Sequence, residues 1–290
     1  MHGSDRKLAR LFHPLTGKMV IAPLDHGVME GMLTGLEELQ RLLEMVGEFP
    51  VQGIVLNKGA LRAYLQDVPL FSQAIAQLSG GTRHCLPPYA RSLMCGAAEA
   101  LRLGADMVAV QVNIANEMED RMLADMGAIV DEAHGLGTPV LALIAPKGDR
   151  VVNEMDPSLI NHCIRLGAEL GADVTGVPYS GDARSFGRAV GASGMPVVVT
   201  GGPSKADFKS FASMIEAALE AGASGTCIGR NVFQNPNPRE AMRRIVELVH
   251  GPEVLAEAEA AVAAVKAAQA EAEAAERNPA GDVAGDVAGD

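Results

Sequence analysis

Short apolar segments alternate with longer segments of helical period along most of the chain. Eight of the short segments are predicted strands: MVIAPLDHG, GIVLNKG, TRHCLPP, DMVAVQVNI, PVLALIAPKG, DVTGVPYSG, PVVVTGGPS and GTCIGRNVF. The longer segments between them, such as DFKSFASMIEAALEAGA, have the spacing of helices, and several end in Gly-Ala or Leu-Gly, which is typical of a helix stop. Strands that alternate with helices indicate a parallel sheet.

The number of these units predicts the fold class. Near-continuous apolar strands indicate a sheet that is buried on both faces. Eight strand–helix units in about 250 residues are typical of an α/β protein of the (β/α)8, or TIM, barrel type. A doubly wound open sheet is the alternative. No GxGxxG motif follows the first strand, which weakens the dinucleotide-binding version of that alternative.

The composition changes after Gly251-Pro252. Residues 251–277 are rich in Ala and Glu and predict one extra C-terminal helix, whose thin stripe of Ala and Val would pack on the barrel or on another subunit. Residues 278–290 carry a short Ala-Gly-Asp-Val repeat and predict a disordered tail. The sequence thus predicts a catalytic barrel over residues 1–250, a helix and a tail.

Composition and charge narrow the range of partners. The chain has 290 residues, 48% of them hydrophobic, and a formal net charge of -12, which argues against nucleic acids and anionic membranes as partners. No apolar run reaches the length of a transmembrane helix, and the polar N-terminus lacks the apolar centre of a secretory signal. The four cysteines form no CxxC pair, as expected of reduced thiols. We therefore expect a cytoplasmic protein with no membrane contact.

Glycines stand at the ends of the last two predicted strands. They are Gly201, Gly202 and Gly229, and Arg230 follows directly. In a barrel of this type the loops after strands seven and eight commonly bind phosphate, because backbone N–H groups can approach the anion there. We expect these three glycines and Arg230 to bind a substrate phosphate. The alternative is that the glycines only make tight turns and that Arg230 pairs with a surface carboxylate.

Other strand ends carry candidate catalytic groups. Asp25 and His26 follow the first strand, where a carboxylate and an imidazole could remove and return a proton, or could simply cap and pack against the loop. Lys58 and Lys147 follow strands two and five, where a desolvated amine could form a Schiff base with a ketone; singly, each is as well explained as a solvated loop lysine. His84 would complete a three-ligand metal site with the aspartate and His26, although a structural histidine is the simpler interpretation.

Several segments resemble the archaeal-type class I fructose-bisphosphate aldolases. They are VIAPLDHGVMEG, GIVLNKGAL, LRLGADMVAVQVNIANEMED, PYSGD, VVVTGGPS and AGASGTCIGRNVFQNPNP, and the resemblance runs from Leu8 to His250. Relatives of this family include aminodideoxyheptulosonate synthase and the thiolase of a phosphorylated signal. The resemblance implies a (β/α)8 barrel in which Asp25 is an acid/base residue and the last two strand ends hold the substrate phosphate.

Two catalytic side chains that the resemblance implies are missing. The Schiff-base lysine of the family lies on strand six, where this chain has Gly176, and the catalytic tyrosine falls on Ala145. Three explanations stay open. The lysine role has moved, to Lys147 or, as second candidate, Lys58; a divalent metal on the ligands named above polarises the ketone; or catalysis has been lost.

The resemblance implies an aldolase, that is, an aldehyde-lyase. Such an enzyme would form or cleave a carbon–carbon bond between a ketose-phosphate donor like dihydroxyacetone phosphate and an aldehyde acceptor. Aspartate semialdehyde is the acceptor in one secondary-metabolism branch of the relatives. An acyl-transferring thiolase and a catalytically inactive sugar-phosphate-binding protein are the alternatives. We expect no organic cofactor, a small phosphorylated substrate as partner, and a homo-oligomer.

Overall fold

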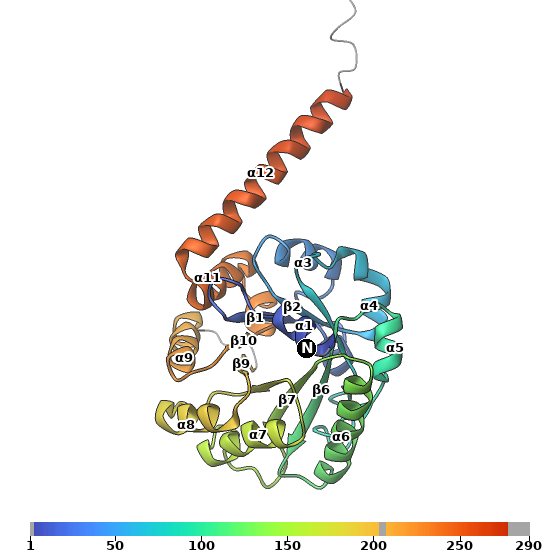
Figure 1. The fold of residues 1–290 in the computed structure, drawn as a ribbon, viewed down its shortest axis with the longest axis vertical. Coiled ribbons are helices and arrows are strands. Elements are labelled where there is room, and N and C mark those ends of the chain that lie inside the picture. Colours follow the sequence, from blue (N-terminus) through green and yellow to red (C-terminus); the bar gives the residue numbers. More distant parts are fainter. Residues whose placement is uncertain (1–2, 203–206, 278–290) are drawn as a thin grey trace, which may run out of the picture.

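The computed structural model describes residues 3–202 and 207–277, and within them eight parallel strands close into a barrel (Figure 1). The barrel strands are β1 (Met19–Pro23), β2 (Gly53–Asn57), β3 (Gln73–Gln77), β6 (Met107–Ile114), β7 (Val140–Pro146), β8 (Val174–Val177), β9 (Val197–Thr200) and β10 (Gly225–Cys227). They follow one another around the barrel in chain order, and β10 pairs with β1 to close it. This arrangement confirms the predicted (β/α)8 fold.

The third barrel strand is β3, and the prediction of a strand over residues 82–88 is wrong. β3 has the sequence QAIAQ, and all five of its residues are buried. The glutamines at both ends hide this strand from a search for apolar runs. Their amide nitrogens nevertheless have carbonyl partners: Gln77 Nε2 donates to Ser79 O at 2.9 Å, and Gln73 Nε2 donates to Lys7 O. Residues 82–88 form an exposed loop, in which Leu86 is 92% exposed.

The chain forms helices before, between and after the barrel strands, and most of those between the strands form an outer layer around the barrel (Figure 1). They are α1 (Gly3–Ala9), α2 (Gly27–Glu30), α3 (Leu39–Val46), α4 (Lys58–Tyr64), the 3-10 turn η1 (Leu65–Asp67), α5 (Ala97–Arg102), α6 (Glu119–Gly135), α7 (Pro157–Glu169), α8 (Ala183–Ser193), α9 (Phe208–Glu220), α10 (Arg230–Phe233), α11 (Pro238–His250) and α12 (Pro252–Arg277). A small antiparallel pair, β4 (Ser79–Gly80) and β5 (Ser92–Leu93), lies between β3 and α5.

The core divides into two apolar clusters, as a barrel with an outer helical layer requires. One cluster fills the barrel interior and includes Met19, Ile21 and Leu141. The larger one lies between the strands and the helices and includes Ile54 and Phe211. Both faces of the sheet are therefore buried, which explains why most of the strands are near-continuous apolar runs.

Side-chain caps define where the outer helices begin. The Asp156 carboxylate accepts the backbone N–H groups of Ser158 and Leu159 at the start of α7. Asp182 accepts the N–H of Ser185 at the start of α8. These caps satisfy N–H groups that have no partner inside the helix, and they fix where the loops after β7 and β8 end.

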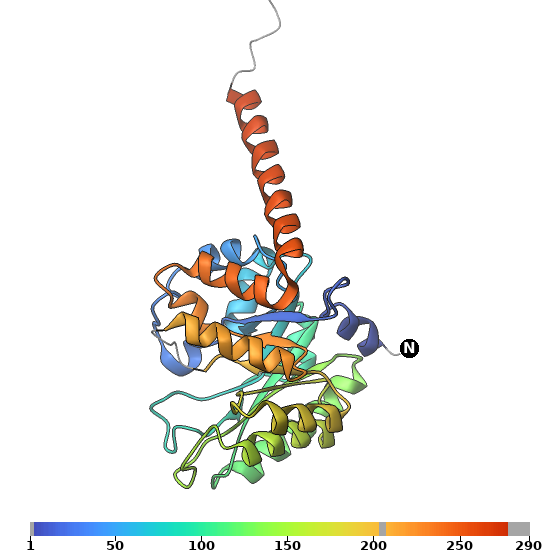
Figure 2. The same cartoon turned by 90° about the vertical axis from the view of Figure 1, so that its left-hand side faces the viewer.

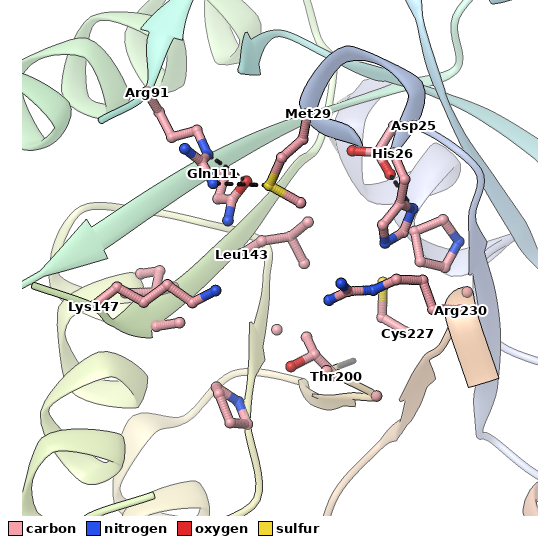
Figure 3. Close-up of a pocket in the computed structure, with 18 of the residues that line it drawn as sticks. Asp25, His26, Met29, Arg91, Gln111, Leu143, Lys147, Thr200, Cys227 and Arg230 are labelled. Atoms are coloured by element: carbon pink, nitrogen blue, oxygen red, sulfur yellow. Dashed lines mark hydrogen bonds and ion pairs between the residues drawn. The ribbon is translucent and has the colours of Figure 1, made fainter. Parts of the chain in front are cut away.

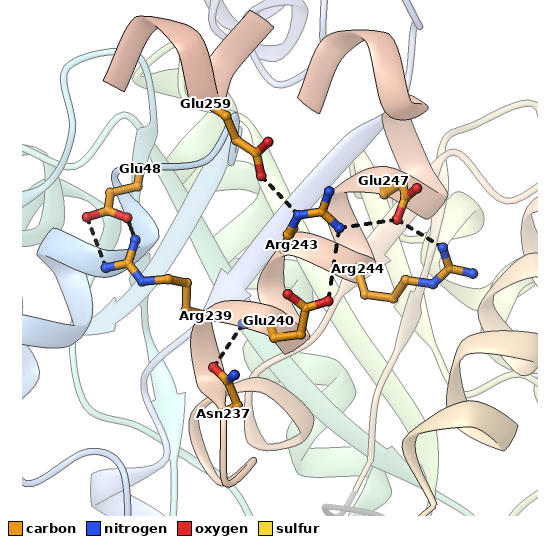
Figure 4. A network of polar contacts seen from close by, with 8 residues as sticks. All are labelled: Glu48, Asn237, Arg239, Glu240, Arg243, Arg244, Glu247 and Glu259. Carbon is orange, nitrogen blue, oxygen red and sulfur yellow. Dashed lines mark hydrogen bonds and ion pairs between the residues drawn. The ribbon is translucent and has the colours of Figure 1, made fainter. Parts of the chain in front are cut away.

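The last helix, α12, extends away from the barrel as a single rod in both views (Figures 1 and 2). Its first half is tied to the barrel by charged side chains. Arg243 Nε donates to Glu259 Oε1 at 3.0 Å, and Lys266 Nζ donates to Glu48 Oε1 at 2.8 Å. Figure 4 shows Arg239 paired with the same Glu48. Exposed ion pairs of this kind contribute at most about 1 kcal/mol each, so they orient the helix more than they stabilise it.

Two further predictions concern the C-terminal residues 251–290 and the absence of a membrane-spanning helix. The sequence predicts a helix over residues 251–277, where the structure has α12, and the predicted tail at 278–290 lies outside the described residues. In the described part of the chain, no helix combines the length and the apolar character that crossing a bilayer demands.

Candidate active site

A cavity of about 210 Å³ opens at the carboxyl ends of the barrel strands (Figure 3). This is the face on which barrel enzymes build their active sites. Seven of the residues singled out from the sequence line it: Asp25, His26, Lys147, Gly201, Gly202, Gly229 and Arg230. Gly176 and Ala145 line it as well. The structure thus brings together most of the candidate groups, although they are spread over more than two hundred positions of the sequence.

Asp25 and His26 lie directly after β1, where the chain turns into α2. Asn57 Nδ2 donates to the Asp25 backbone carbonyl at 2.5 Å and fixes this turn. His26 Nδ1 lies 3.6 Å from Asp25 Oδ1 and is buried without a hydrogen-bond partner in the described structure. The imidazole packs edge-on against Phe233, with the ring centroids 5.4 Å apart.

The protonation state of His26 follows from these surroundings. Burial lowers its pKa, the Asp25 carboxylate partly opposes this, and Arg230 lowers it further. A neutral imidazole is therefore favoured near neutral pH, and it can hold or accept a proton beside the carboxylate.

Lys147 follows the last residue of β7 and extends into the cavity (Figure 3). Burial lowers its pKa, and the cationic groups of Arg91 and Arg230 add to this, while Glu154 opposes it. Among the described residues no carboxylate lies within 4 Å of the Lys147 amine. A lysine in such surroundings is a free amine, and hence a nucleophile, at lower pH than an exposed lysine.

Lys58 and His84 lie outside this cavity. Lys58 is the first residue of α4, and its amine lies 3.3 Å from Glu99 Oε1 on the surface, where its side chain is 45% exposed. His84 lies in the exposed loop after β4, not on the third strand. The structure places Asp25 and His26 side by side, but His84 does not join them, and residues 3–202 and 207–277 contain no group of three or more His, Cys, Asp or Glu arranged to hold a metal.

A neighbouring side chain fills the space beside Gly176, the position at which the resemblance implies a lysine. Gly176 lies in β8 beside Leu143 of β7 in the parallel register. A Cβ atom added to Gly176 would lie 2.6 Å from Leu143 Cδ2, well inside normal contact. Leu143 therefore fills the space that a side chain at position 176 would need, and Ala145, two residues further on, adds only a methyl group.

The two glycine loops follow the neighbouring strands β9 and β10 and contact each other at the mouth of the barrel. Asn231 Nδ2 donates to Gly201 O at 2.9 Å and joins the loop after β9 to the loop after β10. Gly202 has a φ of +62°, which favours glycine. Arg230 Nη1 lies 3.7 Å from Glu30 Oε1, and Arg230 Nε is buried without a hydrogen-bond partner in the described structure. Burial lowers the pKa of Arg230, while the carboxylates of Glu30 and Asp25 oppose this, so this wall presents a partly desolvated cation beside the backbone of the glycine loops.

Among the cavity residues that sequence reasoning missed is the buried cation Arg91. It is 4% exposed and contacts Gln111, a residue of β6 that also lines the cavity. Arg91 comes just before β5, in a segment that follows the wrongly predicted third strand. Nothing in its immediate sequence, Tyr89-Ala90-Arg91-Ser92, distinguishes it from a surface arginine.

Comparison with known proteins gives a consistent result. Residues 19–235 match the model of the DeoC/LacD family aldolase. The chain is 35% identical over 244 residues to the 2-amino-4,5-dihydroxy-6-oxo-7-(phosphonooxy)heptanoate synthase of Streptomyces griseus, covering 84% of this chain and 89% of that protein. It is 31% identical over 258 residues to a class 1 fructose-bisphosphate aldolase of Thermoproteus tenax, covering 87% of this chain and 96% of that one.

Solved structures agree with these matches. An archaeal fructose-1,6-bisphosphate aldolase, solved with its catalytic Lys covalently bound to the carbinolamine intermediate of the substrate, is 29% identical and superposes with a TM-score of 0.76. The superposition covers 86% of this chain and 100% of that chain. The sequence and structure comparisons therefore confirm the resemblance drawn from the motifs.

Proposed function

The chain belongs to the DeoC/LacD aldolase family, and from this premise we propose that it is an aldolase in which Lys147 replaces the strand-six lysine. The reaction joins a donor like dihydroxyacetone phosphate to an aldehyde acceptor such as aspartate semialdehyde. The observation that carries the proposal is the position of the Lys147 amine, in the same cavity as Asp25 and the glycine loops and with a lowered pKa.

The chemistry follows from these groups. The Lys147 amine adds to the donor ketone, and loss of water gives an iminium. Asp25 removes a proton from the carbon next to the iminium, and His26, neutral beside it, can hold that proton. The resulting enamine attacks the aldehyde carbon, whose oxygen takes up a proton. Water then releases the product and restores the amine.

The glycine loops and Arg230 bind the donor phosphate in this proposal. Backbone N–H groups of Gly202 and Gly229 can approach an anion closely, and Arg230 supplies a charge-assisted hydrogen bond. The Gly201 N–H donates to Cys227 O at 3.4 Å, so Gly201 contributes by the shape of the loop. An anion there would also supply the acceptor that Arg230 Nε lacks in the described structure. The site would hold the donor with its ketone toward the interior of the cavity.

The name of the Streptomyces griseus relative supports an acidic acceptor. Its product is a heptanoate with a phosphonooxy group on the carbon farthest from the carboxylate. Three carbons of dihydroxyacetone phosphate and four of aspartate semialdehyde add up to this seven-carbon acid. We propose the same class of reactants for this chain.

A catalytically inactive sugar-phosphate-binding protein is the second candidate. It is favoured by Gly176 and Ala145, because neither can act through a side chain and Leu143 occupies the space beside Gly176. It would keep the phosphate loops and use Lys147 only as a cation.

Exchange of the donor protons separates the two candidates. Dihydroxyacetone phosphate is incubated with the protein in heavy water, and deuterium incorporation is followed by NMR. We expect exchange with the wild type and with Lys58→Met, which removes a surface amine, and none with Lys147→Met. Exchange that survives in Lys147→Met refutes the relocated lysine, and absence of exchange in the wild type favours the binding protein.

A further inference from the structure

Arg91 is a buried cation without a carboxylate partner. Its guanidinium donates from Nε to Gln111 Oε1 at 3.0 Å and from Nη1 to the carbonyls of Pro88 and Ala90, at 3.1 and 2.8 Å. Its Nη2 contacts only the sulfur of Met29, at 3.2 Å, and sulfur is a weak acceptor. No described carboxylate lies within 4 Å of the guanidinium. Burial lowers the pKa of Arg91, and the carboxylates of Asp25 and Glu30 oppose this only from beyond that distance. A buried charge without a directly paired counterion is costly unless a ligand pairs with it.

Gln111 turns a second donor toward the cavity. Because its Oε1 accepts from Arg91, its Nε2 points the other way, into the space between the labelled residues of Figure 3. The described structure shows no hydrogen bond from this nitrogen. The wall formed by Arg91 and Gln111 thus offers two donors, of which one bonds only to the sulfur of Met29 and the other makes no hydrogen bond in the described structure.

This wall lies across the barrel mouth from the phosphate loops. Gln111 belongs to β6 and Arg230 follows β10, and these strands are four places apart in the closed ring of eight, which is the largest separation available. Figure 3 shows Arg91 and Gln111 on one side of the cavity and Arg230 on another, with Leu143 between them. The cavity therefore has two cationic ends.

We propose that Arg91 and Gln111 bind the carboxylate of the acceptor, so that the cavity takes a chain with a phosphate at one end and a carboxylate at the other. The inference rests on the proposed function, which supplies the phosphate end. Two donors from neighbouring side chains, one from the guanidinium and one from the amide, can bind the two oxygens of a carboxylate. The glycine loops that suit a phosphate lie at the other end.

A pair of unreactive ligands tests this directly. 6-Phosphogluconate is an open six-carbon chain with a phosphate at one end and a carboxylate at the other, and sorbitol 6-phosphate is the same chain with a hydroxyl in place of the carboxylate. Hydrogen bonds between charged groups predict that the wild type binds 6-phosphogluconate roughly 10–100-fold more tightly in calorimetry. Equal affinities overturn the proposal, and tighter binding of sorbitol 1,6-bisphosphate contradicts the assignment to a carboxylate.

Gln111→Glu removes the site with little change of shape. The new carboxylate pairs with Arg91 and replaces the Gln111 donor by an oxygen, so the preference for 6-phosphogluconate is expected to disappear. Gln66→Glu adds the same charge on the exposed surface and is expected to keep it. Thermal melts of both variants check that they are folded. A preference retained in Gln111→Glu, or lost in Gln66→Glu, refutes the assignment.

Failure of this inference differs from failure of the proposed function. The two ligands do not react, so their binding reports the carboxylate end whether or not Lys147 forms an iminium. Absence of donor exchange together with a strong preference for 6-phosphogluconate refutes the aldolase and leaves the second anion site. Donor proton exchange together with equal affinities for 6-phosphogluconate and sorbitol 6-phosphate supports the aldolase and refutes the second anion site.

Discussion

Gly229, in the loop after β10, lies very close to the end of β1 and to the loop that carries Asp25 and His26. A Cβ added there would lie 2.3 Å from the backbone carbonyl oxygen of Pro23, 3.0 Å from His26 Cε1 and 3.1 Å from Phe233 Cε1. The nearest obstacle is backbone, which cannot rotate away as a side-chain end can. Gly229→Ala therefore has to push the end of β1 away from the start of α10.

The size of the effect follows from these distances. A normal carbon–oxygen contact is about 3.3 Å, so the two loops must separate by roughly 1 Å. Overpacking of this kind costs about 1–3 kcal/mol of the free energy of unfolding, and the backbone contact favours the upper half of that range. Asp25 and His26 move with the displaced loop, and a misplacement of about 1 Å can lower the rate about 100-fold.

Urea unfolding followed by circular dichroism measures the stability, and donor proton exchange measures the catalytic geometry. Gly191→Ala is the matched control, since a Cβ there meets nothing within 4 Å in α8, and it is expected to leave exchange unchanged and to raise stability by up to about 1 kcal/mol. If Gly229→Ala unfolds at the same urea concentration as the wild type and exchanges donor protons at the wild-type rate, the close approach of the two loops is refuted.

Three further predictions address the site. Asp25→Asn is expected to keep the affinity for dihydroxyacetone phosphate in calorimetry and to abolish proton exchange; unchanged exchange would remove Asp25 from the mechanism. Arg230→Ala should weaken the binding of sorbitol 6-phosphate roughly 10–100-fold and that of sorbitol hardly at all. Equal losses of affinity for the two ligands would place Arg230 away from the phosphate. Burial lowers the pKa of Lys147 in the folded protein below the value of 10.5 in the unfolded chain. Between the two pKa values the unfolded chain binds more protons than the folded protein, so the free energy of unfolding rises with pH up to 10.5. Lys147→Met should therefore unfold at higher urea concentration than the wild type at pH 7, with the gap closing toward pH 10.5; a gap that is absent or constant would contradict the burial of a titrating amine.

The barrel could be predicted because its strands are buried on both faces. Runs such as the VVVT of β9 and the VLALIAP of β7 are almost entirely apolar, and seven of the eight predicted runs are strands of the closed sheet. β3 escaped because Gln73 and Gln77 are buried polar residues whose amides bond to nearby carbonyls. Hydrophobicity alone cannot reveal a buried strand that has polar side chains at both ends, one of which bonds to a backbone carbonyl 66 positions away.

Site residues could be predicted from the sequence only where the end of a strand places them in the cavity. Gly229 and Arg230 come two and three residues after the end of β10, so the strand end places them in the cavity. Arg91 reaches the cavity from a loop, and Leu143 fills the space beside Gly176 across two strands. Both depend on side-chain contacts between residues far apart in sequence, and a single sequence carries no local signal for them.

Borohydride reduction tests the central claim most directly. The protein is mixed with dihydroxyacetone phosphate, reduced with borohydride, digested and mapped by mass spectrometry. A relocated Schiff base predicts that the reduced donor is attached to Lys147 and that Lys147→Met carries no label. Label on Lys58 or another lysine, or no label at all, would contradict the assignment of Lys147 as the nucleophile.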